Sequence, residues 1–144
     1  MTAKKYKVLF LCTGNQARSQ MAEALMRSQA EDRFDVHSAG SNPKTSVHPL
    51  AVEVLGEIGI DITGAVPKGM LEFIDERFDY VITLCDDARD TCPVFPGHPV
   101  SEHWNILDPA AAEGSKDDRL AAFRSARDVI AGRIDRFLES PPEH

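Results

Sequence analysis

The sequence predicts an α/β fold in which a mainly parallel sheet is covered by helices on both faces. Apolar strand segments alternate with amphipathic helix segments, and the strand segments are almost continuously apolar, as in buried parallel strands. The 144 residues, 42% hydrophobic and 27% charged, are typical of one globular domain. We find no internal repeat, linker or low-complexity segment, and treat residues 1–144 as a single domain.

The first half of the chain predicts two strands and two helices in alternation. Its strand segments are apolar, and its helix segments repeat apolar residues every three or four positions. The strands are expected at 6–11 and 34–38, and the helices at 17–30 and from Pro49 to Gly56 or Gly59. Turn-forming residues at 39–43 follow the second strand.

The second half predicts a third strand, a long loop and a closing helix. A weaker helix is expected at 70–76, and a buried strand with β-branched residues at 80–84. Residues 93–115 are rich in Pro, Gly and His, which indicates a functional loop with a short strand at 102–105. The closing amphipathic helix is expected at 119–138.

Charge and hydropathy exclude several partners. The net charge of −7 argues against nucleic acid, because phosphate backbones are bound through a surplus of Lys and Arg. The apolar run near the N-terminus, Val8 to Leu11, is too short for a signal peptide, and no segment approaches a membrane span. We therefore expect a cytoplasmic protein without a nucleic-acid or membrane partner.

The loop after the first strand predicts an oxyanion site beside a nucleophile. Cys12 ends the strand, and Arg18 begins a helix six residues later. Inward-turned loop amides, the helix N-terminus and the Arg18 fork suit a tetrahedral oxyanion. The same field predicts a lowered pKa for Cys12, with Ser19 as a hydrogen-bond donor to the sulfur. The expected oxyanion-binding residues are Thr13, Gly14, Asn15, Gln16, Ala17 and Arg18.

The loop and several later motifs resemble the thioredoxin-coupled arsenate reductases, which share the fold of low-molecular-weight protein tyrosine phosphatases. The resemblance rests on CTGNQARSQMAEAL from Cys12 onward, SAG at 38–40, TLC at 83–85, CP at 92–93, EHW at 102–104 and DP at 108–109. It spans nearly the whole chain and implies four parallel strands in the order 2-1-3-4. It also implies arsenate as substrate and thioredoxin as electron donor, and we expect a monomer.

Reduction by three cysteines is what this resemblance implies. Cys12 would attack arsenic while Arg18 holds the oxygens and Asp108 acts as general acid. Cys85 would displace arsenite to form a Cys12–Cys85 disulfide, which Cys92 opens to leave Cys85–Cys92. Arsenate reduction needs the two electrons that two thiols release, whereas phosphoester hydrolysis needs none. The implied catalytic residues are Cys12, Arg18, Ser19, Cys85, Cys92 and Asp108.

A helix between Cys85 and Cys92 would keep these two thiols apart. Seven helical residues span roughly 10 Å, whereas disulfides need Cα atoms within about 7 Å. The intervening residues 86–91 are polar and carry no large apolar side chain. We expect this segment to loop out toward solvent on oxidation, where thioredoxin can reach it.

We predict no metal and no cofactor. Some members of the family bind potassium near the loop, and Asn15, Glu23 and Ser38 resemble its ligands. Lys68 stands where the remaining acidic ligand would be, so its ammonium would replace the ion. A potassium ion at these residues stays the alternative.

Several other interpretations stay open. The chain could be a tyrosine phosphatase, although DPAAAEG lacks the tyrosines those enzymes often carry after DP, or a noncatalytic oxyanion-binding module. Cys12 could be an apolar core residue with Arg18 at the surface, and a nucleotide loop would need the absent Gly-Lys-Ser or Gly-Lys-Thr. A small thiol such as mycothiol or glutathione could replace thioredoxin. The later site residues have their own alternatives: core thiols at Cys85 and Cys92, a zinc site adding His98 and His103, and a turn role for Asp108.

Overall fold

The computed structural model describes residues 5–142 and forms one parallel four-stranded sheet in the order β2-β1-β3-β4. Its strands are β1 (Tyr6–Cys12), β2 (Phe34–Gly40), β3 (Tyr80–Thr83) and β4 (Val100–His103). The predicted α/β class and strand order are confirmed. The carboxyl ends of β1 and β3 lie side by side, because Leu11 pairs with Thr83.

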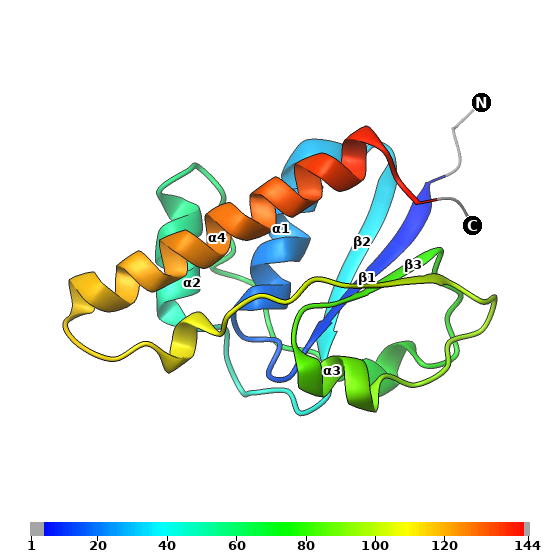
Figure 1. Ribbon diagram of the computed structural model, residues 1–144, viewed down its shortest axis with the longest axis horizontal. Coiled ribbons are helices and arrows are strands. Elements are labelled where there is room, and N and C mark those ends of the chain that lie inside the picture. Colours follow the sequence, from blue (N-terminus) through cyan, green and yellow to red (C-terminus); the bar gives the residue numbers. More distant parts are fainter. Residues whose placement is uncertain (1–4, 143–144) are drawn as a thin grey trace.

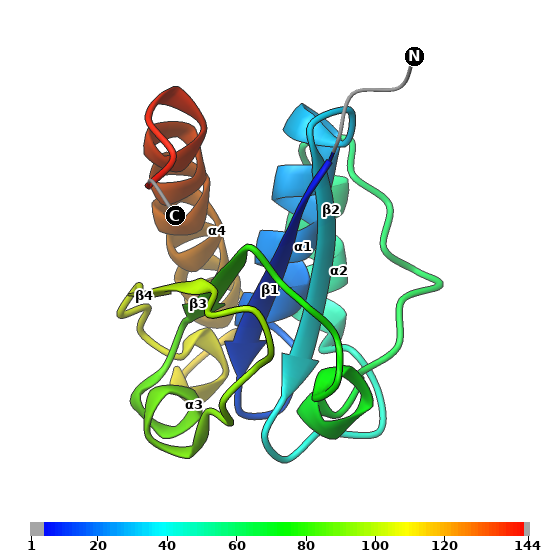
Figure 2. The ribbon, with the colours of Figure 1, turned by 90° about the vertical axis from the view of Figure 1, so that its right-hand side faces the viewer.

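Three longer helices cover one side of the sheet, and a short helix lies on the other (Figure 1). The longer helices are α1 (Arg18–Ala30), α2 (Pro49–Gly56) and α4 (Lys116–Glu139), and the short one is α3 (Asp86–Thr91). Figure 2 shows α3 near the edge of the sheet toward which the β1 and β2 arrows point. Two 3-10 turns, η1 (Met70–Phe73) and η2 (Pro109–Ala111), complete the elements. Within residues 5–142, no helix is both long and apolar enough to cross a membrane.

The core lies between the sheet and the three longer helices. Residues 8–11 of β1 are fully buried. Near the opposite end of the sheet from α3, the rings of Phe34, Tyr80 and Phe137 pack in tilted and edge-on contacts with centroids 5.0 to 6.4 Å apart. These aromatic contacts join β2, β3 and α4, so burial of apolar area fixes the sheet that carries the site.

Several element boundaries differ from the sequence prediction. Strand β2 runs to Gly40, whereas it was expected to end at residue 38 with a turn at 39–43, because its last residues continue the pairing with β1. Helix α4 begins at Lys116 rather than at residue 119, because Ser115 and Asp118 form a capping box with two 3.1 Å hydrogen bonds. The short strand lies at 100–103 rather than 102–105, since Val100 pairs with Tyr80 at the start of β3. The weak helix expected at 70–76 is only the 3-10 turn η1.

Candidate active site

A buried asparagine holds the loop between β1 and α1. Asn15 is fully buried and has a φ of 50°, a left-handed conformation that Asn tolerates better than most residues. Its Nδ2 donates to Ser19 Oγ at 2.7 Å and Ser38 Oγ at 3.0 Å. Its Oδ1 accepts from Gln20 Nε2 at 3.0 Å and from the Lys68 amide at 2.8 Å. These four hydrogen bonds fix the shape of the loop before any ligand binds.

The loop carbonyls point outward, toward the segment that follows β2. The carbonyl oxygens of Cys12, Thr13, Gly14 and Gln16 accept from the amides of Ser41, Asn42, Lys44 and His48 at 2.8–3.0 Å. In a trans peptide the N–H points away from the C=O, so the amides after these carbonyls face the other way. A row of amides turned to one side can bind an anion. This geometry supports the predicted oxyanion loop.

Gly40 lets the end of β2 approach this loop. A Cβ at Gly40 would lie 2.4 Å from the Thr13 carbonyl oxygen and 2.9 Å from the Asn15 amide nitrogen. Both neighbours are backbone atoms, which cannot move aside as a side chain can. Gly40 was predicted only as a turn residue, and its packing role follows from its pairing with Cys12 across the β1–β2 ladder.

The Cys12 thiol is buried at the base of the loop. It is 2% exposed, and its Sγ lies 2.8 Å from Ser19 Oγ, which confirms the predicted contact. Burial raises the pKa of Cys12, while hydrogen bonds from the Ser19 hydroxyl and from the Ser19 and Asn15 amides lower it. The predicted net lowering of the pKa is therefore wrong: desolvation of the thiolate outweighs the donors.

Arg18 and Asp108 face each other at the edge of the loop. Arg18 Nη1 donates to the Ile106 carbonyl at 3.0 Å, and Nη2 lies 3.8 Å from Asp108 Oδ2. Asp108 Oδ1 accepts from the Ala110 amide at 3.0 Å, so the residue also caps η2. Asp108 therefore has both roles at once: its Oδ1 caps the turn, and its Oδ2 faces Arg18 at the edge of the loop.

Cys85 lies beside the loop and caps the short helix α3. Its Sγ is 3.3 Å from Thr13 Oγ1, and it accepts from the Ala88 amide at 3.4 Å. Cys85 is 7% exposed. The third thiol, Cys92, follows the last residue of α3, so the expected helix between the two cysteines is present. All three cysteines are unpaired thiols in this structure.

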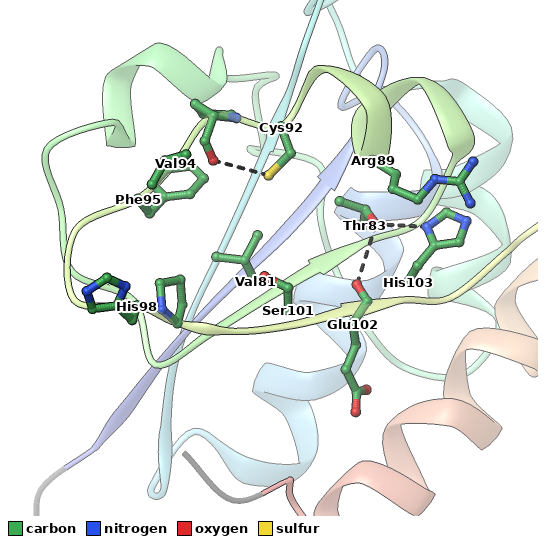
Figure 3. A pocket seen from close by; sticks show the side chains of 12 residues that line it. Val81, Thr83, Arg89, Cys92, Val94, Phe95, His98, Ser101, Glu102 and His103 are labelled. Carbon is green, nitrogen blue, oxygen red and sulfur yellow. Dashed lines mark hydrogen bonds between the residues drawn. The ribbon is translucent and has the colours of Figure 1, made fainter.

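Cys92 lines a cavity of about 490 Å³ between α3, β3 and β4 (Figure 3). The thiol is half-buried, and its Sγ lies 3.5 Å from the Pro93 carbonyl. Burial raises the pKa of Cys92. In Figure 3 Phe95 comes from the segment after α3, whereas Val81 and His103 come from the two strands. The cavity therefore lies next to the helix that must rearrange if Cys92 is to reach Cys85.

The residues expected near a cation lie behind the loop. Ser38 Oγ donates to Glu23 Oε1 at 2.9 Å, and Lys68 Nζ lies 3.8 Å from the same oxygen. The Lys68 ammonium thus lies beside Glu23, one of the residues expected near the cation. Among residues 5–142, no group of three or more His, Cys, Asp or Glu side chains could hold a metal, so the alternative zinc site gains no support.

Comparisons with known proteins agree with this arrangement. Residues 7–142 match the model of the low molecular weight phosphotyrosine protein phosphatase family. An arsenate reductase of Shouchella clausii is 42% identical over 92% of this chain and 95% of its own length. The arsenate reductase of Bacillus subtilis is 41% identical over the same shares.

Solved structures give the same relationship. The thioredoxin-dependent arsenate reductase of Corynebacterium glutamicum superposes with a TM-score of 0.75 at 33% identity, covering 97% of this chain and 63% of that longer one. An arsenate reductase in an oxidised state gives a TM-score of 0.79 at 29% identity over 92% of this chain and 96% of that one.

A parallel sheet that delivers a cysteine into an anion-binding loop, with an arginine at the start of the next helix, defines the class of this protein. The chain belongs to the low molecular weight phosphotyrosine protein phosphatase family. Within that family it belongs with the arsenate reductases, to which it is about 40% identical over most of its length.

Proposed function

We propose that the protein reduces arsenate to arsenite with electrons from its own three cysteines. The observation that carries the proposal is their placement: Cys12 lies in the loop, Cys85 contacts the loop through Thr13, and Cys92 lies at the far end of α3. Phosphoester hydrolysis would use the loop but has no step for the second and third thiols. A two-electron reduction uses both.

In the first step the Cys12 sulfur attacks arsenic. The loop amides and the Arg18 guanidinium hold the oxygens, and charge-assisted hydrogen bonds make this binding strong. Asp108, 3.8 Å from Arg18, gives its proton to the departing oxygen, which leaves as water. Ser19, 2.8 Å from the sulfur, stabilises the Cys12 thiolate.

In the second step the Cys85 thiolate attacks the Cys12 sulfur. The sulfur–arsenic bond breaks, its electron pair stays on arsenic, and arsenite leaves with a Cys12–Cys85 disulfide behind it. Cys92 then attacks Cys85 and returns Cys12 as a thiolate. The remaining Cys85–Cys92 disulfide takes two electrons from thioredoxin, which closes the cycle. Unwinding of α3 exposes that disulfide to the donor.

A coupled assay tests this proposal against the phosphatase alternative. With thioredoxin, thioredoxin reductase and NADPH, arsenate should drive NADPH oxidation, and Cys12→Ser, Cys85→Ser or Cys92→Ser should each abolish turnover. Hydrolysis of p-nitrophenyl phosphate is measured in parallel, where only Cys12→Ser should matter. Vigorous hydrolysis with no arsenate-dependent NADPH oxidation would assign the chain to the phosphatases instead.

A further inference from the structure

Helix α3 depends on contacts at its first turn. It has six residues, of which only Ala88 is buried. Isolated helices shorter than about 12 residues are marginal in water, so neighbouring groups must hold α3 in place. Asp87 Oδ2 accepts from Ser41 Oγ at 2.7 Å and from Thr13 Oγ1 at 3.4 Å. The preceding residue, Asp86, makes a different contact.

His103 is the last residue of β4. Its ring makes hydrogen bonds to one residue before Cys85 in the sequence and to one residue after it. Its Nδ1 lies 2.8 Å from Thr83 Oγ1, and its Nε2 lies 3.1 Å from Asp86 Oδ1. A carboxylate only accepts, so Nε2 carries a proton and donates it to Asp86, while Nδ1 shares a hydrogen bond with the Thr83 hydroxyl. Figure 3 shows the Thr83–His103 contact at the edge of the cavity lined by Cys92. The imidazole thus joins the end of β3 to the start of α3.

We infer that His103 is a positioning residue that stabilises the reduced, helical arrangement of α3 through Asp86. The inference rests on the proposed Cys85–Cys92 disulfide. That bond cannot form across an intact helix, because the two cysteines would be roughly 10 Å apart. Asp86 is the first residue of α3, so unwinding of this helix removes the backbone geometry that holds the Asp86 carboxylate 3.1 Å from the imidazole. The His103–Asp86 contact therefore stabilises the dithiol but not the disulfide.

The equilibrium between dithiol and disulfide measures this effect without arsenate or enzyme turnover. In a Cys12→Ser background only Cys85 and Cys92 remain as thiols. Mixtures of reduced and oxidised dithiothreitol exchange two electrons with this pair: the two thiols become one disulfide while the cyclic dithiothreitol disulfide becomes a dithiol. Alkylation and mass spectrometry of the intact chain then give the fraction oxidised.

His103→Ala and Asp86→Ala should each raise the equilibrium constant for oxidation roughly three- to tenfold, the range expected for one hydrogen bond. A tenfold rise corresponds to a reduction potential lower by about 30 mV. The double variant should shift no further than Asp86→Ala alone, because the effect of His103 passes through Asp86, whereas Asp86→Ala also removes the 3.5 Å ion pair with Arg89. Asp86 is largely exposed, so its variant keeps the fold.

Ser101→Ala is the matched control, since Ser101 also lies on β4 and lines the same cavity. It should leave the equilibrium constant unchanged. Unchanged constants in both single variants, or independent shifts that add in the double variant, would overturn the role of His103. If the Cys12→Ser protein itself forms no Cys85–Cys92 disulfide, the relay under the proposed function fails as well. This outcome differs from the failure of the His103 role alone, in which the disulfide forms but the variants do not shift its equilibrium.

Discussion

Single side chains set the reactivity of Cys12, and Ser19 is the closest of them. Its hydroxyl lowers the pKa of Cys12 against the larger effect of burial. In Ser19→Ala this opposition is lost, the pKa rises further, and less thiolate is present at neutral pH. The rate of Cys12 alkylation at pH 7 should fall several-fold, as expected for one hydrogen bond, and its pH profile should move to higher pH. An unchanged profile would show that Ser19 does not act on the sulfur.

A substitution at Asp108 can separate its role in capping η2 from its role as a proton donor. Asn can cap η2 as Asp does, so Asp108→Asn should preserve the fold while removing the proton donor. We expect kcat for arsenate reduction to fall roughly 10²- to 10⁴-fold, with little change in KM. A fall in affinity with kcat intact would instead assign Asp108 to holding Arg18, from which it lies 3.8 Å away.

The sequence predicted which side chains lie together at the loop better than their electrostatic state. Cys12, Arg18 and Ser19 could be placed together because a strand, a loop and a helix set their positions by short-range geometry. The direction of the Cys12 pKa shift was predicted wrongly, because that shift depends on burial by the whole molecule. The contacts of His103 with Thr83 and Asp86 were also missed, because β4 and α3 meet only through tertiary pairing.

At the scale of elements, the approach of β2 to the nucleophile loop depends on Gly40. Gly40→Ala should destabilise the protein by about 1–3 kcal/mol, the usual cost of overpacking, since the new Cβ would meet backbone atoms at 2.4 and 2.9 Å. Gly132→Ala in α4 is the control: nothing lies within 4 Å of its Cβ position. It should stabilise by about 0.5–1 kcal/mol. Urea denaturation measures both, and equal effects would refute the packing argument.

Glu57 connects α2 to α4 through two arginines. Its carboxylate contacts Arg124 at 2.6 Å and Arg127 at 3.0 Å. The Arg124 hydrogen bond, with Arg127, lowers the pKa of Glu57 below its ordinary value of 4.5. Its stabilisation is therefore present above pH 4.5 and is lost as the pH falls through the folded-state pKa.

The free energy of unfolding of Glu57→Gln should consequently be lower than that of the wild type at pH 7, with the gap closing in acid. Chemical denaturation at several pH values measures it. Glu113→Gln is the control: it removes the same charge from an exposed glutamate that forms no ion pair within residues 5–142. Its free energy of unfolding should equal that of the wild type at every pH. A gap independent of pH would mean that Glu57 acts through packing and not through its charge.

Elements with strong periodicity were predicted closely, and those defined by tertiary pairing were displaced. Helix α1 was expected at 17–30 and lies at Arg18–Ala30. The short strand β4 was expected two residues too late, because its register is set by pairing with β3, which no local pattern encodes. Helix α4 starts earlier than its apolar face, because a capping box precedes that face.

At the scale of the whole molecule, the fold brings Cys12 and Cys85, which are far apart in the sequence, to one place and leaves Cys92 at the other end of α3. The pairing of β1 with β3 puts Cys12 and Cys85 at the same edge of the sheet, and α3 separates Cys85 from Cys92. In the proposed relay, oxidation passes from Cys12 to Cys85 and then to Cys92. This order requires that α3 unwinds while the rest of the fold stays intact.

Mass spectrometry of the thiols after arsenate treatment without reductant tests that claim most directly. Wild-type protein should contain a Cys85–Cys92 disulfide, and Cys92→Ala should instead stop at Cys12–Cys85. Three free thiols in the wild type after arsenate treatment, together with active phosphoester hydrolysis, would contradict the relay.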